Sequence, residues 1–287
     1  MTAAQTMMLA INASMFLVVF KLGLDTTFAG VTYLFRRPGL LLRSILAMNV
    51  VMPVLAVVAC LVFHPSQTIA VALIGLAISP VPPFLPTQQL GAGGPSRYVF
   101  GLLVATALAS IVLVPAWIAL IDVAFARDVQ IPAAKVAMIM LITVLAPLVL
   151  GVAARRYASA FADRIARPVG VVGNVLLAAA VIPLLVVVTP LFWPLVGSGV
   201  IAALVAFTLI GISVGHALGG PDASRRAVLA LATGSRHPGI ALAIATINFP
   251  ARTDVIAVVI YHLVIGALVA LPYVIWRKRV RMQARNT

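Results

Sequence analysis

Long stretches without any charged residue constrain the fold of this chain more than any other feature. Five stretches of about twenty residues or more contain no Asp, Glu, Lys or Arg. A helix needs about 20 apolar residues to cross a bilayer, and only helices and closed barrels satisfy their backbone there. The alternating ten-residue pattern of a barrel is absent, so we predict an all-α membrane protein. The five stretches are Ser44–Phe63, Tyr98–Ile121, Val136–Ala154, Pro168–Pro221 and Val255–Trp276.

Composition excludes the soluble class. Hydrophobic residues make up 63% of the 287 positions and charged residues only 9%, whereas a soluble domain is about half apolar and a quarter charged. A net charge of +14 would indicate nucleic acid in a soluble protein. Here the basic residues follow the ends of apolar segments, so the expected partner is the lipid bilayer and not nucleic acid. The single cysteine, Cys60, excludes an internal disulfide, and we expect it inside a helix.

The apolar pattern predicts one transmembrane domain, residues 1–287, with nine helices. No soluble domain or low-complexity linker interrupts the pattern, and the N-terminal segment is typical of a spanning helix, not a signal peptide. The predicted helices are 6–28, 40–63, 68–90, 97–123, 133–155, 168–192, 195–219, 224–248 and 253–276.

Two of these helices should be broken. The third contains four prolines within seven positions, and each interior proline costs about 3 kcal/mol in lost hydrogen bonding and steric clash. Such a segment must lie where protein or a water-filled cavity satisfies the freed backbone groups. The eighth helix is interrupted by Gly234, Pro238 and Gly239. The prolines of the third helix are Pro80, Pro82, Pro83 and Pro86.

The spacing of the two breaks predicts an inverted repeat. They are five spans apart, and an odd separation reverses the direction of the second broken helix. Helices 6–123 therefore correspond to helices 168–276 with inverted topology, and the fifth helix joins them. Interrupted helices at matching positions of two inverted halves indicate a transporter binding site, where we expect them to cross near the midplane.

The distribution of Lys and Arg predicts the orientation. With nine spans and the N-terminus outside, 15 of the 20 basic residues fall on the inner side. Only Arg127, Lys135 and Arg252 fall outside, and Lys21 and Arg236 lie within spans. This bias predicts a cell membrane protein, in the inner membrane of a bacterium, with a cytoplasmic C-terminus. The fifteen are Arg36, Arg37, Arg43, Arg97, Arg155, Arg156, Arg164, Arg167, Arg225, Arg226, Arg277, Lys278, Arg279, Arg281 and Arg285.

Arg236 is the most informative single residue, because it lies near the middle of a span. An arginine there costs at least about 2.5–3.5 kcal/mol, and such residues usually face a cavity or a partner. One interpretation is a fixed cation for a small anionic substrate, assisted by the half-helix that begins near Pro238. The other is a structural strut that caps the carbonyl groups of the broken helix.

Several polar residues near the breaks are candidate substrate ligands. His237 is either a proton-coupling site or a hydrogen-bonded packing residue. Asn49 either faces the third helix or bonds to a neighbouring helix. The remaining candidates follow or flank the breaks, where Thr87 and Gln88 could alternatively cap the second half-helix. These candidates are Ser79, Thr87, Gln88, Thr233 and Ser235.

Residues for catalysis, metal binding or a cofactor are missing. The chain has no Glu and only six Asp, so paired-carboxylate catalysis and HExxH metal sites lack their residues. Gly211 to Gly215 matches a nucleophile elbow, but this motif needs a strand–turn–helix context. We therefore expect neither an enzyme nor a cofactor.

Lys21 and Asp25, four residues apart, are expected to pair with each other near the membrane interface.

The order of these motifs resembles the bile acid:sodium symporter family and its wider superfamily, which includes arsenical-resistance permeases. The resemblance implies a core domain of crossing helices that moves against a panel domain. It rests on residues 21–25 with 37–38, 49–53, 79–82 and 233–241.

The sequence departs from that family where sodium would bind. Sodium-coupled members carry Glu and Gln on the second crossing helix, and this chain has Ala232 and Arg236 at the matching positions. The family's Ser-Asn ligands at the first break fall among residues 84–86, which have no side-chain oxygen. Sodium needs oxygen ligands, and arginine offers none. Ser79 also stands where the permeases have cysteine.

These observations predict a secondary transporter of a small organic anion, with sodium coupling in doubt. The alternative is a membrane-embedded ligand sensor or regulatory subunit that does not translocate its ligand.

Overall fold

The structure is a computed structural model that describes residues 3–125 and 131–286. The side chains of residues 3–8, 124–125 and 284–286 are not described. Arg127 and the side chain of Arg285, which entered the predicted charge distribution, lie outside the described part.

All regular structure in the described residues is helical, which confirms the all-α prediction, and Cys60 lies buried in a helix as expected. Several spans consist of two helices joined through a π-helical turn or across a non-helical break. The elements are α1 (Ala3–Leu24), α2 (Phe28–Val31), α3 (Pro38–Ile45), η1 (Leu46–Val51), α4 (Met52–Phe63), α5 (Gln67–Ile78), α6 (Leu85–Gly91), α7 (Ser96–Phe125), α8 (Ala133–Met140), η2 (Leu141–Leu145), α9 (Ala146–Tyr157), α10 (Ser159–Phe192), η3 (Trp193–Leu195), α11 (Val200–Leu218), α12 (Ala223–Gly234), α13 (Pro238–Asn248) and α14 (Thr253–Asn286).

The helices have the length and composition of a polytopic membrane protein. Within the described residues, seven helical segments are long and apolar enough to cross a membrane. Two shorter apolar helices, Leu9–Leu24 and Gln67–Ile78, accompany them. Many large apolar side chains are exposed on the helix surfaces, as expected where lipid covers the chain.

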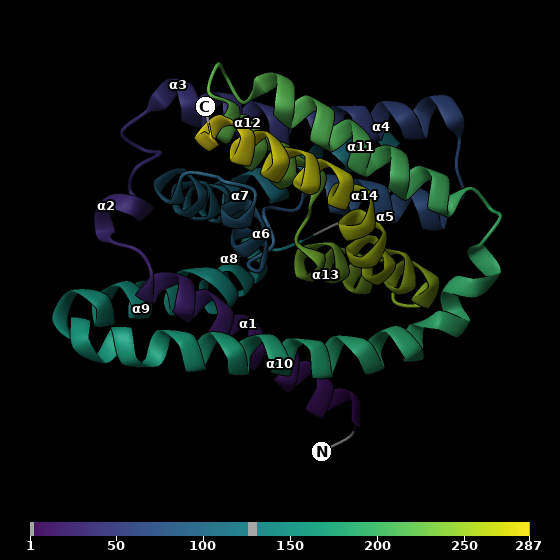
Figure 1. The fold of residues 1–287 in the computed structure, drawn as a ribbon. Helices are drawn as coiled ribbons and strands as arrows, with labels where there is room; N and C mark the ends of the chain where they lie inside the picture. Colours follow the sequence, from purple (N-terminus) through teal and green to yellow (C-terminus); the bar gives the residue numbers. More distant parts are fainter. Residues whose placement is uncertain (1–2, 126–130, 287) are drawn as a thin grey trace.

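One group of helices forms a separate layer. Helices α1, α9 and α10 pack together along one side of the molecule, below the remaining helices in Figure 1. Glycines allow α1 and α9 to approach closely: a Cβ atom at Gly23 would lie 2.8 Å from the Cα atom of Gly151. Small residues permit such backbone approach between membrane helices.

A second close contact joins α11 to α12. Gly211 and Gly215 lie four residues apart on one face of α11, and Gly219, the residue directly after the helix, continues this spacing. A Cβ atom at Gly211 would lie 2.6 Å from the carbonyl oxygen of Thr233, and one at Gly215 would lie 2.6 Å from the Cα atom of Ala230. These glycines hold α12 firmly against α11. Their position inside a helix also excludes the nucleophile elbow.

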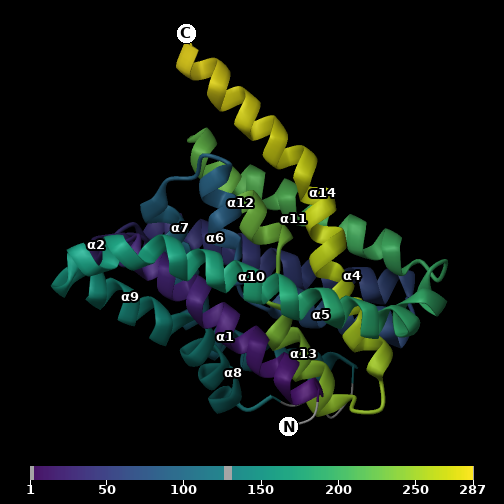
Figure 2. The ribbon, with the colours of Figure 1, turned by 60° about the horizontal axis from the view of Figure 1, so that its bottom comes forward.

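Two predicted helix ends are wrong for one physical reason. Helix α10 begins at Ser159 and not at 168, so Arg164 and Arg167 lie in a helix and not in a loop. Helix α14 continues past Trp276 to Asn286, and this end extends from the body of the molecule (Figure 2). Ala and Arg are good helix formers, and a charged helix end remains stable outside the apolar layer. Charge marks the limit of the apolar segment, not of the helix.

Candidate functional site

The first break separates α5 from α6. Helix α5 ends at Ile78, and the Ser79 hydroxyl group donates a hydrogen bond to the carbonyl oxygen of Gly75 at 2.6 Å. The prolines that follow have no N–H group, so this segment supplies acceptors and few donors. Helix α6 begins at Leu85, whose N–H group donates a hydrogen bond to the carbonyl oxygen of Pro82 at 3.1 Å. The residues from Ser79 to Pro83 are buried.

The second break separates α12 from α13. The N–H group of Ser235 bonds to the carbonyl oxygen of Leu231 at 3.1 Å and closes α12. Nδ1 of His237 accepts a hydrogen bond from the N–H group of Gly239 at 3.0 Å, so His237 is the N-cap of α13. Pro238 occupies the first helical position, which suits proline.

The two breaks lie against each other. The N–H group of His237 donates to the carbonyl oxygen of Pro80 at 2.9 Å. Nη1 of Arg236 donates to the carbonyl oxygen of Ser79 at 3.2 Å. Donors of the second break therefore satisfy the acceptors that the proline-rich first break leaves open. The half-helices continue this packing, α5 against α13 and α6 against α12 (Figure 1).

Arg236 is fully enclosed, with a relative exposure of 0%. Its Nη1 bonds to Ser79, but its Nε and Nη2 are buried without a hydrogen-bond partner among the described residues. No ion pair of the described part includes it. A buried cation is costly unless an anion and full hydrogen bonding compensate it. The strut interaction is present, and two guanidinium nitrogens have no partner among the described residues.

Asn49 lies in the π-helical turn η1 (Leu46–Val51). Pro53, four residues later, has no N–H group, so the carbonyl oxygen of Asn49 is free and accepts from Nε1 of Trp117 at 2.6 Å. The side-chain amide of Asn49 is buried, and neither of its polar atoms has a partner among the described residues. The turn η1 packs against α5, α11 and α12, and thus beside both broken segments.

The other candidate ligands differ in their surroundings. Thr233 is buried, and its hydroxyl group donates to the carbonyl oxygen of Leu229 at 2.8 Å. Ser235 is half-buried. Nε2 of His237 is buried without a partner in the described part of the chain. These three residues belong to the second break or its edge.

Thr87 and Gln88 do not share this environment. Both are exposed, and no side chain caps the start of α6, so neither predicted role for them is supported. The buried polar residue of α6 is Gln89, whose Nε2 donates to the carbonyl oxygen of Val228 in α12 at 2.9 Å. Its spacing of four from buried Leu85 is the sequence signal for the inward face. The hydrogen bonds of Gln89 to Val228 and of Trp117 to Asn49 were not predicted from the sequence.

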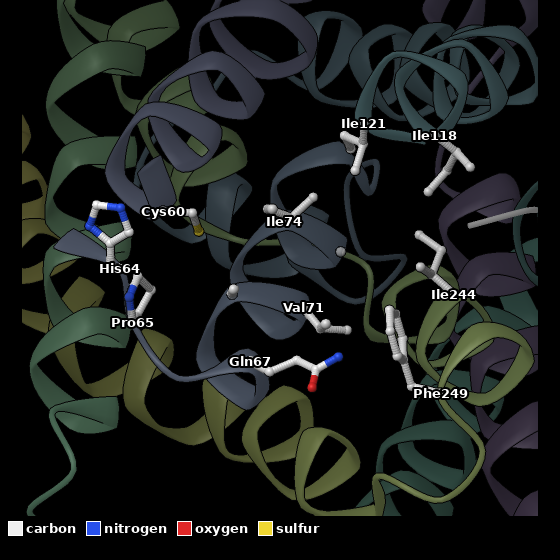
Figure 3. A pocket seen from close by; sticks show the side chains of 12 residues that line it. Cys60, His64, Pro65, Gln67, Val71, Ile74, Ile118, Ile121, Ile244 and Phe249 are labelled. Carbon is white, nitrogen blue, oxygen red and sulfur yellow. The ribbon is translucent and has the colours of Figure 1, made fainter. Parts of the chain in front are cut away.

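A cavity of about 260 Å³ lies between the C-terminal end of α4, helix α5 and the C-terminal parts of α7 and α13. Figure 3 shows Ile118, Ile121, Ile244 and Phe249 on one side of it, and Cys60 and His64 on the other. Gly75, whose carbonyl oxygen accepts the Ser79 hydroxyl group, also lines it, so it comes within one helical turn of the first break. Arg236 does not line it.

A second cavity, of about 520 Å³, lies between α4, α5 and α11 and is almost wholly apolar. Arg236 does not line this cavity either. In the described part of the chain, no group of three His, Cys, Asp or Glu side chains is arranged to hold a metal ion.

The fold and the paired breaks define the class: a polytopic α-helical membrane protein with two interrupted helices. The sequence model of the sodium bile acid symporter family matches residues 13–192, more than half of the chain. The chain belongs to this family, whose members are membrane transporters and not enzymes. The match includes the first break and ends at Phe192, before the second. A comparison with curated proteins found no match.

Proposed function

We propose that this chain is a secondary transporter of a small organic anion that works by alternating access. The seven long helices and two shorter ones would form nine spans of one domain, 1–287. Helices 6–123 and 168–276 would be inverted repeats joined by the α8–α9 span. The layer of α1, α9 and α10 would act as the panel, and the helices with the two breaks as the core.

Arg236 is the observation that carries the proposal. Its guanidinium group is fully buried where the breaks meet, with Nε and Nη2 unpaired among the described residues. Arginine binds a carboxylate or sulfonate with two parallel hydrogen bonds, and this interaction is strong where water is excluded. His237, Asn49, Thr233 and Ser235 would surround the same group. Opening of the core against the panel would give the anion access to it.

We infer further that transport does not need sodium. The carbonyl oxygen of Ser79 accepts from Arg236, so a guanidinium group occupies a position where a main-chain oxygen could otherwise ligate a cation. Ala232 is buried and contributes only a methyl group. A fixed charge would thus do electrostatically what a bound sodium ion does in related transporters.

The expected location is the inner membrane of a bacterium, with the N-terminus outside and the C-terminus in the cytoplasm. Support comes from Arg43, Arg97, Arg225 and the basic end of α14, which all fall on the predicted inner side.

Flux into proteoliposomes tests the proposal. We expect saturable uptake of radiolabelled carboxylates, with taurocholate and smaller carboxylates as probes, at equal rates in sodium and choline buffers. A proton gradient in the choline buffer tests His237 as a coupling residue. A saturable dependence on sodium would contradict the sodium inference. Saturable binding without flux would favour the sensor alternative.

A further inference from the structure

A second buried arginine lies far along the chain from the breaks, at the end of the spanning part of α14. Arg277 has a relative exposure of 9%, and its Nη2 donates to the carbonyl oxygen of Ala223 at 2.7 Å. Its Nε is buried and has no partner among the described residues. The guanidinium group also lies over Trp276, with Cζ 5.2 Å from the ring centroid. The group is held in place with one donor unused.

Arg226 lies in the first turn of α12, three residues after Ala223, whose carbonyl oxygen accepts from Arg277. Nε of Arg226 donates to the carbonyl oxygen of Gly220 at 2.5 Å, which fixes this side chain as well. At the same junction, Nδ1 of His216 in α11 and Oη of Tyr273 in α14 are 2.7 Å apart and join these two helices. Arginines from α12 and α14 are therefore both anchored at the start of α12.

No carboxylate compensates these two charges. The ion pairs of the described residues are Lys21–Asp25, Arg155–Asp163, Arg225–Asp222 and Arg252–Asp254, and none includes Arg226 or Arg277. Two fixed guanidinium groups with an unused buried donor form a site that favours a phosphate-like anion.

We propose that this junction of α11, α12 and α14 binds the phosphate group of an anionic membrane lipid. The aromatic residues Tyr273 and Trp276 come just before Arg277, and Trp276 is 48% exposed, as expected for side chains at the membrane–water interface. Lys278, Arg279 and Arg281 follow and are exposed on the α14 extension, where they attract an anionic surface (Figure 2). A lipid whose phosphate group binds at this depth would extend its acyl chains into the bilayer.

The site also has a structural consequence. Arg277 links α14 to the start of α12, the helix that leads to the second break. A bound lipid would stabilise the start of α12, the same helix that packs closely against the glycines of α11.

Lipid retention by the purified full-length protein tests the proposal. In native mass spectrometry we expect phosphatidylglycerol to be retained in preference to phosphatidylcholine with the same acyl chains. Arg226→Gln and Arg277→Gln should each weaken this retention about fivefold, because each removes one charge from the headgroup. The matched control is Arg164→Gln on α10, which removes an exposed charge outside this junction and should change retention less than twofold.

Three results would overturn the proposal. The first is equal retention of both lipids, and the second is an equal loss in all three variants, which would indicate unspecific attraction. The third is displacement of the lipid by potassium phosphate at the same concentration, which would indicate a site for free phosphate. If Arg277→Gln does not fold, Arg277→Lys and Arg226→Gln carry the same test.

Discussion

The first break, residues 79–84, and the second, residues 235–237, interrupt their helices with opposite chemistry. The first is rich in proline and presents the carbonyl oxygens of Ser79 and Pro80. The second presents the N–H group of His237 and the guanidinium group of Arg236. One break thus supplies acceptors and the other supplies donors, so each satisfies what the other leaves open.

The buried polar atoms that remain without a partner lie on the second break. After the contacts with the first break are made, Nε and Nη2 of Arg236 and Nε2 of His237 remain buried without described partners. A buried polar atom without a partner costs about 1–3 kcal/mol, more when it is charged. Among the described residues, the first break leaves no buried side-chain polar atom without a partner, whereas the second leaves these three.

The largest expected effect on stability comes from the packing of the two broken helices. At Gly215, which faces α12, a Cβ atom would lie 2.6 Å from the backbone of Ala230. Gly215→Ala should therefore destabilise the fold by about 2 kcal/mol and lower the apparent Tm by about 5 °C in detergent.

Gly75→Ala is the matched control on α5. A Cβ atom there would lie 3.7 Å from Ala241, an ordinary van der Waals contact. We expect its Tm to stay within about 1 °C of that of the unchanged protein. Equal losses in both variants would show that the two broken helices are packed alike.

A smaller effect concerns the helix caps that follow the breaks. The His237 side chain caps α13, whereas α6 begins without a side-chain cap. His237→Ala should cost about 1 kcal/mol of stability, and His237→Asn should retain most of it because Asn is a good N-cap. Thermal unfolding of both variants checks this. A full loss in the Asn variant would show that the ring matters for a reason other than the cap.

The smallest expected effect is a pH dependence at the start of α12. The Asp222 carboxylate accepts hydrogen bonds from the Ser224 hydroxyl group and from the N–H groups of Ser224 and Arg225, and the Ser224 hydroxyl group contributes most to lowering the pKa of Asp222. A lowered pKa means that this cap stabilises the fold above the unfolded value of about 4. The contribution is lost as the pH falls through the lower, folded pKa.

Because Asp222 is 40% exposed, the change should be small. We expect Tm to fall more steeply below about pH 4 in the unchanged protein than in Asp222→Asn. The helix before the first break has no equivalent cap: Ser66, the N-cap residue of α5, makes no side-chain hydrogen bond to that helix. Parallel curves for the two proteins would contradict this role of Asp222.

The sequence predicted both breaks because proline and glycine act locally. Four prolines within seven positions, or a proline between two glycines, disrupt several helical hydrogen bonds at once, and α5 and α12 end at these runs. A single proline does not have this effect, since Pro115 lies inside α7. The inverted repeat remains a prediction. The hydrogen bond between Trp117 and Asn49 was not predictable, because these residues are 68 positions apart and only the tertiary fold brings them together.

The outward position of Thr87 and Gln88 has a specific cause. A broken helix resumes at a phase set by the length of the non-helical segment, and the sequence does not specify that length. Helix α6 begins at Leu85, so Gln89 faces inward, and Thr87 and Gln88 face outward. Lys21 lies in the last turn of α1, and the N–H group of Asp25, directly after the helix, donates to its carbonyl oxygen at 3.1 Å. No break intervenes between these two residues, and their predicted ion pair is confirmed.

Anion binding by Arg236→Gln tests the central claim most directly. The variant should bind the carboxylate probes at least about 30-fold more weakly, since charge-assisted hydrogen bonds to the guanidinium group are lost. It should remain folded in detergent, Arg236→Lys should recover part of the binding, and Arg97→Gln, which removes an exposed charge, should bind normally. Normal binding by folded Arg236→Gln would contradict the substrate role, and a Gln variant that cannot be obtained folded would show that Arg236 is a strut.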